Sequence, residues 1–298
     1  MRLRSLPLLL FAALIAACST LTPLPVPRNS VPAFSASGVA RVVVIILENG
    51  NADCAARQPF MKARAAEGMV FLRYFGIAHP SQPNYIAMIS GSTENALTNS
   101  PLTLNREHLG NALQKRWRVY ADDYPPLAGR CNLVRQSGLY VRRHVPFLSF
   151  ADVQNGTCSQ IVRLNSASDP VAALRADIEG QSLPDFSLII PNLKHDGHSP
   201  ATLADANAWL TANIAPLLAL PAFTKDTVFV LTFDEDETRS AKSNRIFTVI
   251  WGDHVRQGTN ADVYNHLDLL LTIAALLRVP PPATLDQKDA RPIGGIWQ

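Results

Sequence analysis

The sequence lacks several features that would assign a function directly. Its 298 residues contain no internal repeat, no paired Cys-x-x-Cys spacing and, after the first 17 residues, no apolar run long enough to span a bilayer. Only 17% of the residues are charged, the formal net charge is +3, and no basic or basic-aromatic run stands out. These absences argue against a cysteine-ligated zinc site, an internal membrane span and a nucleic-acid-binding surface.

The N-terminus is typical of an exported protein. Arg2 and Arg4 precede the apolar run Leu8 to Ala17, so we expect residues 1–17 to be a signal peptide. Ile15-Ala16-Ala17-Cys18 resembles a bacterial lipobox, in which the cysteine is acylated, and Ser19 after it favours an outer-membrane destination. We therefore expect a lipoprotein of the cell envelope that faces the periplasm and meets the membrane only through the lipid on Cys18. Plain cleavage after a small residue is the alternative.

Proline and cysteine positions suggest how the rest of the chain is organised. Residues 18–38 are rich in proline and small residues and predict a semi-extended tether, so the folded domain is expected over 39–298. Residues 121–165 lack periodicity and predict a loop-rich excursion. Cys131 and Cys158 lie within this excursion, so we expect them to form a disulfide in an oxidising compartment and to leave one thiol over among the remaining cysteines.

Apolar runs alternate with helical segments along the domain. Strands are predicted at 41–47, 70–75, 117–120, 186–190, 227–233 and 245–251. Helices are predicted at 59–68, 106–116 and 204–220, from a cap at Asp169 to Gly180, and at 269–277 behind a cap at 265–268. This alternation indicates an α/β fold with a mainly parallel sheet covered on both faces.

Three of the predicted strands end in unusual polar groups. They are followed by Glu48-Asn49, by the segment from Asn192 to His198 that contains Asp196, and by Asp234-Glu235. Because ligands bind beyond the carboxyl ends of parallel strands, we expect these groups to converge on one crevice. Each pair taken alone is more often a loop or cap feature.

The stretch from His79 to Thr93 is the candidate for the chemistry. Pro80 and Pro83 predict a non-helical approach to Ser81 and a helix that starts at or just after Pro83 and stops near Gly91. A serine at such a junction faces free backbone N–H groups that welcome a phosphate. Its ordinary alternative is a helix N-cap.

These residue types together permit phosphoryl transfer. The oxygens of Glu48, Asn49, Asp234 and Glu235 suit Mg²⁺, Ca²⁺ or Mn²⁺, while His198 or His266 nearby would also admit Zn²⁺ or Fe. A cation beside Ser81 would activate this serine as a nucleophile toward phosphorus. The roles expected for the remaining candidates are contact with the phosphate for Asn84 and His79, and protonation of the leaving group for His198 or Asp196. Asn84 has an alternative role, which is to form hydrogen bonds with local backbone groups. His144 is a weaker candidate for the site.

The motifs resemble the phosphoesterase family of acid phosphatases and phospholipases C, part of the alkaline-phosphatase-like superfamily. Five segments carry the resemblance. They are Glu48-Asn49, His79-Pro-Ser-Gln-Pro-Asn-Tyr85, Asn192 to His198, Phe233-Asp-Glu235 and Tyr264-Asn-His266. The resemblance implies an α/β/α sandwich, Ser81 as nucleophile and metal binding by Glu48, Asn49, Asp234 and Glu235. It also implies active-site roles for His198 and His266.

One departure is Asp236-Glu237, which stands where the family has a glycine. We expect a metal-dependent phosphomonoesterase that acts on a small phosphorylated substrate. The alternatives are a phospholipase C-like phosphodiesterase and a non-catalytic envelope lipoprotein that binds a ligand or partner.

Overall fold

The computed structural model describes residues 34, 36–237, 244–285 and 290–298. The expected signal peptide, the lipidation site Cys18 and most of the expected tether lie outside these residues. No helix in the described part of the chain is long and apolar enough to cross a membrane.

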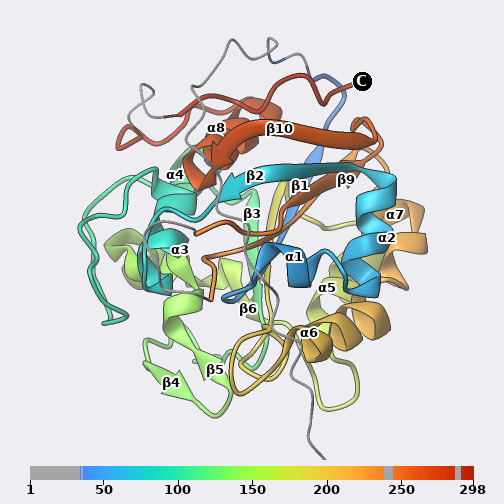
Figure 1. The fold of residues 1–298 in the computed structure, drawn as a ribbon. Coiled ribbons are helices and arrows are strands. Elements are labelled where there is room, and N and C mark those ends of the chain that lie inside the picture. Colours follow the sequence, from blue (N-terminus) through green and yellow to red (C-terminus); the bar gives the residue numbers. More distant parts are fainter. Residues whose placement is uncertain (1–33, 35, 238–243, 286–289) are drawn as a thin grey trace, which may run out of the picture.

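The centre of the molecule is an 8-stranded sheet in the order β10-β2-β9-β8-β1-β7-β3-β6 (Figure 1). Only β9 runs antiparallel to its neighbours in this sheet, so the predicted mainly parallel sheet is confirmed. The strands are β1 (Arg41–Leu47), β2 (Met69–Phe75), β3 (Trp117–Ala121), β6 (Ile161–Arg163), β7 (Phe186–Ile190), β8 (Thr227–Phe233), β9 (Val249–Gly252) and β10 (Gly258–Asn265).

Helices cover both faces of the sheet. In Figure 1, α3 and α4 lie to the left of the sheet, and α2, α5, α6 and α7 lie to its right. The helices are α1 (Ala52–Ala55), α2 (Pro59–Glu67), α3 (Ser81–Ser90), α4 (Leu109–Leu113), α5 (Ala172–Glu179), α6 (Leu203–Trp209), α7 (Pro221–Thr224) and α8 (His266–Leu276). The arrangement is the expected three-layer α/β/α sandwich.

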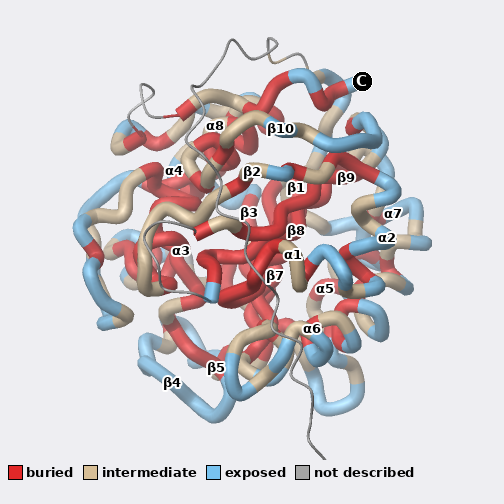
Figure 2. Tube along the Cα trace, viewed as in Figure 1, coloured by how far each residue is buried: buried red, intermediate tan, exposed pale blue. Residues whose placement is uncertain are grey.

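The middle strands form the core. Every residue of β7 and β8, and all of β1 except Arg41, is buried, as Figure 2 shows by colour. Continuous apolar, β-branched runs are what a parallel strand covered on both faces requires. Burial of so much apolar surface is the main stabilising term of the fold.

Several predicted elements differ in extent. The helix expected over 106–116 is reduced to α4, and the helix expected over 204–220 is divided into α6, the π-helix η5 (Leu210–Ile214) and the 3₁₀ helix η6 (Leu217–Ala219). Asp169 does not cap α5 itself; its side chain accepts from the N–H of the N-cap residue, Val171. Strands β6 and β10 were not predicted.

The excursion over 121–165 is ordered by short elements. It holds the hairpin β4 (Gln136–Ser137) and β5 (Tyr140–Val141), then η1 (Arg142–His144), η2 (Pro146–Ser149), η3 (Val153–Thr157), η4 (Cys158–Gln160) and β6. The predicted disulfide between Cys131 and Cys158 is confirmed, with 5.1 Å between the Cα atoms. A bridge that closes a loop of this size contributes about 3 kcal/mol by restricting the unfolded chain. The expected leftover thiol is wrong, because no described cysteine is free.

Candidate active site

The ends of β8, β1 and β7 bring the predicted acidic groups together. The three strands are adjacent in the sheet, and Leu47 on β1 pairs in register with Phe233 on β8. Glu48 and Asp234 therefore leave the sheet side by side. The backbone N–H of Asn49 donates to Asp234 Oδ1 at 2.9 Å. The convergence that the sequence predicted at this edge of the sheet is confirmed for these residues.

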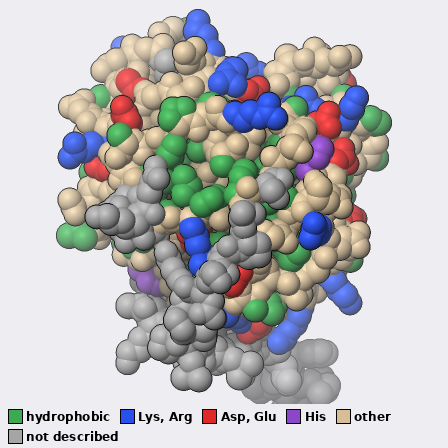
Figure 3. Space-filling view, turned by 90° about the horizontal axis from the view of Figure 1, so that it is seen from above, with side chains coloured by type: hydrophobic (Ala, Val, Ile, Leu, Met, Phe, Trp, Pro, Cys, Tyr) green, Lys and Arg blue, Asp and Glu red, His purple; other side chains and the backbone are tan. Residues whose placement is uncertain are grey.

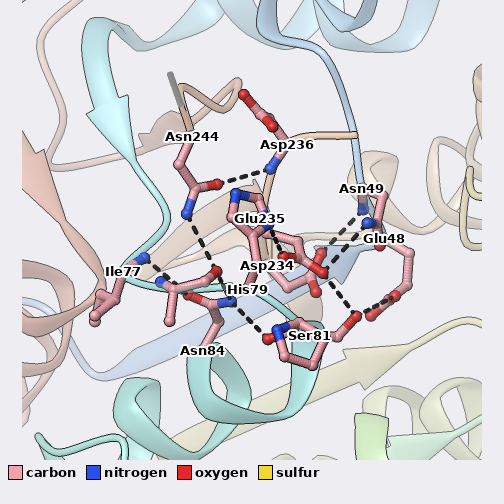
Figure 4. A network of polar contacts seen from close by, with 12 residues as sticks. Glu48, Asn49, Ile77, His79, Ser81, Asn84, Asp234, Glu235, Asp236 and Asn244 are labelled. Atoms are coloured by element: carbon pink, nitrogen blue, oxygen red, sulfur yellow. Dashed lines mark hydrogen bonds and ion pairs between the residues drawn. The ribbon is translucent and has the colours of Figure 1, made fainter. Parts of the chain in front are cut away.

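Ser81 lies between two of the carboxylates. It is the first residue of α3, behind Pro80 at the N-cap, and its side chain makes no capping bond, so an ordinary N-cap role is wrong. Ser81 Oγ is 3.0 Å from Glu48 Oε2 and 3.1 Å from Glu235 Oε1 (Figure 4). A hydroxyl has one proton and can donate to only one of them at a time. The serine is thus the meeting point of acids from β1 and β8.

The start of α3 favours negative charge near Ser81. The helix begins at Ser81, two residues before Pro83, and ends at Gly91, which takes the left-handed conformation with φ 82°. All ten residues of α3 are buried. Gln82 donates its N–H to Asn99 Oδ1 at 3.0 Å and Pro83 has no N–H, so α3 favours a developing alkoxide or a phosphate here chiefly through the positive end of its dipole.

Asn84 and Asn244 hold the loop that delivers Ser81. Asn84 Oδ1 accepts from the N–H groups of Ile77 and Ala78 at 2.8 and 3.0 Å, and its Nδ2 donates to Ala78 O at 2.7 Å and to Pro80 O at 3.4 Å. These bonds use the whole amide, so the local backbone role is the one observed. Contact with a phosphate would require breaking them.

Asn244 connects this serine loop to the acids of β8. Its Oδ1 accepts from the N–H of Asp236 at 2.9 Å, and its Nδ2 donates to Ala78 O at 3.2 Å (Figure 4). Asp236, the residue at which the sequence departs from the family pattern, is therefore incorporated in the site through its backbone. Sequence reasoning missed Asn244 because nothing in its neighbourhood marks it.

Two histidines face the carboxylates. His79 Nδ1 pairs with Glu235 Oε2. His144 Nε2 lies 3.2 Å from Glu48 Oε1, without hydrogen-bond geometry, and its ring stacks on Tyr85 of α3 at 5.2 Å. His144 was only a weak candidate from the sequence, since a histidine in an excursion without periodicity gives no positional signal.

The remaining candidates from the sequence are placed as follows. Asp196 is buried, its carbonyl accepts from the N–H of Glu48 at 2.8 Å, and its Oδ1 accepts from the N–H of His198 at 3.0 Å. His266 is fully buried at the start of α8 and bonds Asp234 O at 2.7 Å through Nε2. A carbonyl only accepts, so Nε2 carries the proton and Nδ1 keeps a free lone pair. His198 is half-buried, and its charge acts on His144.

The electrostatics of the site reflect crowded acids. Burial raises the pKa of Asp234 well above its usual range, and the charges of Glu48 and Glu235 add to this effect. Burial also raises the pKa of Glu235, against the lowering effect of His79. Burial and then the charge of Glu48 raise the pKa of Asp196 to about 8. For Glu48, the nearby His144 and Arg143 outweigh burial and lower the pKa. The crowding therefore disfavours ionisation of all these carboxyl groups at once.

Seven buried polar atoms around this cluster have no hydrogen-bond partner among the described residues. They are Glu48 Oε1, Asn49 Oδ1, His79 Nε2, His144 Nε2, Asp196 Oδ2, Asp234 Oδ2 and His266 Nδ1. A buried polar atom without a partner is costly and calls for an explanation. As the described side chains lie, no three His, Cys, Asp or Glu residues form a ready-made metal cage. Carboxylate and amide oxygens such as those of Glu48, Asn49 and Asp234 are the ligand types that hard divalent cations take.

Solved structures define the class of the fold. A protein of the alkaline phosphatase superfamily from Vibrio parahaemolyticus superposes with a TM-score of 0.60 at 15% identity, over 87% of this chain and 71% of that chain. The phosphonate monoester hydrolase of Silicibacter pomeroyi superposes with a TM-score of 0.57 at 12% identity, over 85% and 76%. The fold is that of the alkaline phosphatase superfamily.

Sequence relatives define the family. Residues 54–280 match the model of the Phosphoesterase family. The chain is 30% identical to the phosphatidylinositol-3-phosphatase of Mycobacterium tuberculosis over 285 residues, which cover 91% of this chain and 87% of that protein. It is 32% identical to an acid phosphatase of Aspergillus fumigatus over 267 residues, which cover 84% of this chain and 58% of that protein. The chain belongs to the Phosphoesterase family, as its motifs predicted.

Proposed function

We propose that this protein is a metal-dependent phosphomonoester hydrolase in which Ser81 is the nucleophile. The observation that carries the proposal is the position of Ser81 Oγ, within hydrogen-bond distance of Glu48 and Glu235 at the first turn of a buried helix. Relatives named acid phosphatases and a phosphatidylinositol-3-phosphatase support a monoester substrate.

The first half of the reaction transfers the phosphoryl group to the protein. Ser81 Oγ gives its proton to Glu235, forms a bond to phosphorus, and the bond from phosphorus to the alcohol oxygen breaks. The positive end of the α3 dipole stabilises the negative charge on the phosphoryl oxygens. His79, paired with Glu235, orients this carboxylate toward Ser81.

Proton delivery to the leaving alcohol falls to Asp196. Its pKa of about 8 keeps this carboxyl protonated near neutral pH, and a protonated acid is what an alkoxide leaving group requires. His198, which follows Asp196 and donates its N–H to that carboxyl group, is the second candidate for this step. Asp196, now ionised, takes a proton from the water that attacks the seryl phosphate. The bond from phosphorus to Ser81 Oγ breaks, Glu235 returns its proton to Oγ, and phosphate leaves.

A divalent cation fits the residues at the serine. Glu48, Asn49, Asp234 and Glu235 would hold it. Glu48 and Glu235 both lie within hydrogen-bond distance of Ser81 Oγ, and Asn49 bonds both Asp234 and Glu235. Such a cation lowers the pKa of a bound hydroxyl and neutralises phosphate charge. Removal of metal and re-addition of Mg²⁺, Ca²⁺, Mn²⁺ or Zn²⁺ identifies the cation. The proposal also includes export and lipidation at Cys18, which lies outside the described residues.

Hydrolysis of p-nitrophenyl phosphate by the purified protein tests the proposal. We expect turnover that disappears in Ser81→Ala and remains in Ser182→Ala, which changes an exposed serine bonded to Asp177. Exclusive release of phosphorylated headgroups from phospholipids would favour the phosphodiesterase alternative. Binding of phosphoesters without hydrolysis of any would favour the non-catalytic alternative.

A further inference from the structure

The dipeptide Asn244-Arg245 contacts each of the three loops that build the reaction centre. It precedes β9 in the chain and runs beside the end of β2. Ile246 donates its N–H to Tyr74 O at 2.9 Å, and Gly76 donates its N–H to Asn244 O at 2.9 Å. The dipeptide therefore lies where β2 passes into the serine loop.

The side chain of Asn244 joins two of these loops. It is 7% exposed. Its Oδ1 accepts from the N–H of Asp236, which directly follows Glu235, and its Nδ2 donates to the carbonyl of Ala78, three residues before Ser81 (Figure 4). An amide offers an acceptor and a donor on one rigid group, so the two bonds set the separation of the loops.

The side chain of Arg245 reaches the third loop, which follows β1. Arg245 Nη2 lies 2.6 Å from Asp53 Oδ1, in an ion pair whose two side chains are 21% and 33% exposed. Asp53 belongs to α1, and its N–H donates to the side chain of the N-cap residue Asn51 at 3.0 Å. Asn51 stands three residues after Glu48 in the chain. The ion pair thus connects the dipeptide to the loop that carries this acid.

Gly76 allows the serine loop to pack directly on the end of β8. A Cβ atom at this position would lie 2.8 Å from Asn244 Oδ1, from Asn244 Nδ2 and from Asp234 O. Since Asp234 O is a backbone atom, it has little freedom to move aside. The acids of the site meet inside the molecule, and outside the grey atoms the face in Figure 3 shows Asp and Glu side chains only scattered among apolar and basic ones.

We propose that Asn244 and Arg245 are positioning residues that place Ser81 relative to the acids of β8 and β1. Asn244 sets the separation of Ser81 from Glu235, and Arg245 steadies the loop that carries Glu48. Neither residue touches the reacting atoms. The inference rests on the proposed function in taking Ser81 and these acids as the reaction centre. Displacement of a reacting group by about 1 Å can lower a rate about a hundredfold, so small shifts of these loops matter.

Kinetics of Asn244→Ala and Asn244→Ser test the first half of the proposal. Both changes remove the link, because a serine hydroxyl is too short to reach both loops. With p-nitrophenyl phosphate we expect kcat to fall at least about tenfold while KM changes less than about threefold. Rates are counted per Ser81 that can be phosphorylated, which corrects for misfolded molecules. Asn207→Ala is the matched control, since Asn207 also joins two elements through one buried amide. A normal rate per reactive serine overturns the role of Asn244.

Exchange of the ion pair tests the second half. Arg245→Gln is expected to lower kcat about threefold, and Arg245→Lys to restore part of the loss. Arg245→Asp combined with Asp53→Arg should be faster than either single change, because the exchange restores the attraction. Arg175→Gln is the control, since Arg175 pairs with Asp169 at the same 2.6 Å with similar exposure. An unchanged kcat in Arg245→Gln, or an exchange no faster than the single changes, overturns the role of Arg245.

Crystal structures of the wild type and of Asn244→Ser keep this outcome distinct from failure of the proposed function. The distance from Ser81 Oγ to the Glu235 carboxylate does not depend on turnover. We expect it to lengthen by about 1 Å or more in the variant. An unchanged distance contradicts the positioning role whether or not the wild type hydrolyses a phosphoester. A longer distance in a protein without hydrolysis supports the positioning role and leaves only the proposed function refuted.

Discussion

Asn49 and Asp234 are joined by a hydrogen bond of 2.9 Å from the Asn49 N–H to Asp234 Oδ1, across the ends of two adjacent parallel strands. Asn49 adopts φ 43°, in the left-handed region. Its Nδ2 also donates to Glu235 Oε1 at 3.3 Å. One residue therefore fixes both acids of β8 relative to β1, and its conformation is one that asparagine tolerates better than most residues.

Substitutions at Asn49 separate the backbone conformation from the side-chain contact. Asn49→Gly keeps the left-handed conformation and loses the amide, whereas Asn49→Ala loses the amide and adds strain. We expect Asn49→Ala to be less stable than Asn49→Gly by about 1 kcal/mol in urea unfolding, with both strongly reduced in activity. Equal stabilities would show that the conformation of residue 49 is not constrained.

The convergence of the acids was predictable from the sequence, and the reason is general. Buried strands of a parallel sheet read as continuous apolar runs, so the ends of β1 and β8 are marked by the change from Leu47 to Glu48 and from Phe233 to Asp234. The rule that ligands bind beyond such ends then places the residues in one crevice. No local motif was needed for that step.

Other parts of the structure gave no comparable signal. Strand β10 (Gly258–Asn265) is mostly polar and only partly buried, and it forms because β2 offers it a partner. Two contacts depend on long-range packing of segments without periodicity. They are the contact of His144 with Glu48 and the hydrogen bond that Asn244 accepts from Asp236. Pairings of this kind are decided by the tertiary structure and leave no pattern in the sequence.

The hydrogen bonds of Asn84 hold the loop that positions Ser81, so their removal should lower activity. Asn84→Ala removes four hydrogen bonds to the loop over 77–80, which should cost about 2–4 kcal/mol in unfolding free energy and lower kcat at temperatures where the variant is folded. Asn207→Ala is a suitable control, since Asn207 bonds the N–H of Phe60 away from the serine. If both variants lose stability equally and neither loses kcat, Asn84 has no role in positioning Ser81.

Removal of metal should affect stability as well as turnover. The acids Glu48, Asp234 and Glu235 repel one another, and a cation bound only by the folded state adds to its stability. We expect dialysis against a chelator to lower Tm by several degrees and to abolish hydrolysis, with recovery of both on addition of one of the four candidate cations. Metal content should fall in Asp234→Asn. An unchanged Tm and full activity after exhaustive chelation would exclude the proposed cation.

Acid sensitivity provides a prediction away from the reaction centre. Burial lowers the pKa of His108, the N-cap of α4, although Asp152 opposes this effect. Below the unfolded-state pKa of about 6.5, the unfolded chain binds a proton that the folded chain does not, so this residue lowers stability as pH falls. His108→Asn, which retains a capping side chain, should lose fewer degrees of Tm between pH 7 and pH 5 than the wild type. The partly exposed His254→Asn serves as control, and a larger acid loss in His108→Asn would reverse the assignment.

The covalent state of Ser81 during turnover tests the central claim most directly. The protein is mixed with a ³²P-labelled phosphomonoester, quenched in acid within a single turnover and digested, and the labelled peptide is sequenced. The serine placed between Glu48 and Glu235 should carry the phosphoryl group, and the label should disappear when unlabelled substrate is added before the quench. Rapid hydrolysis with no labelled peptide, or with the label on a residue other than Ser81, would contradict the account.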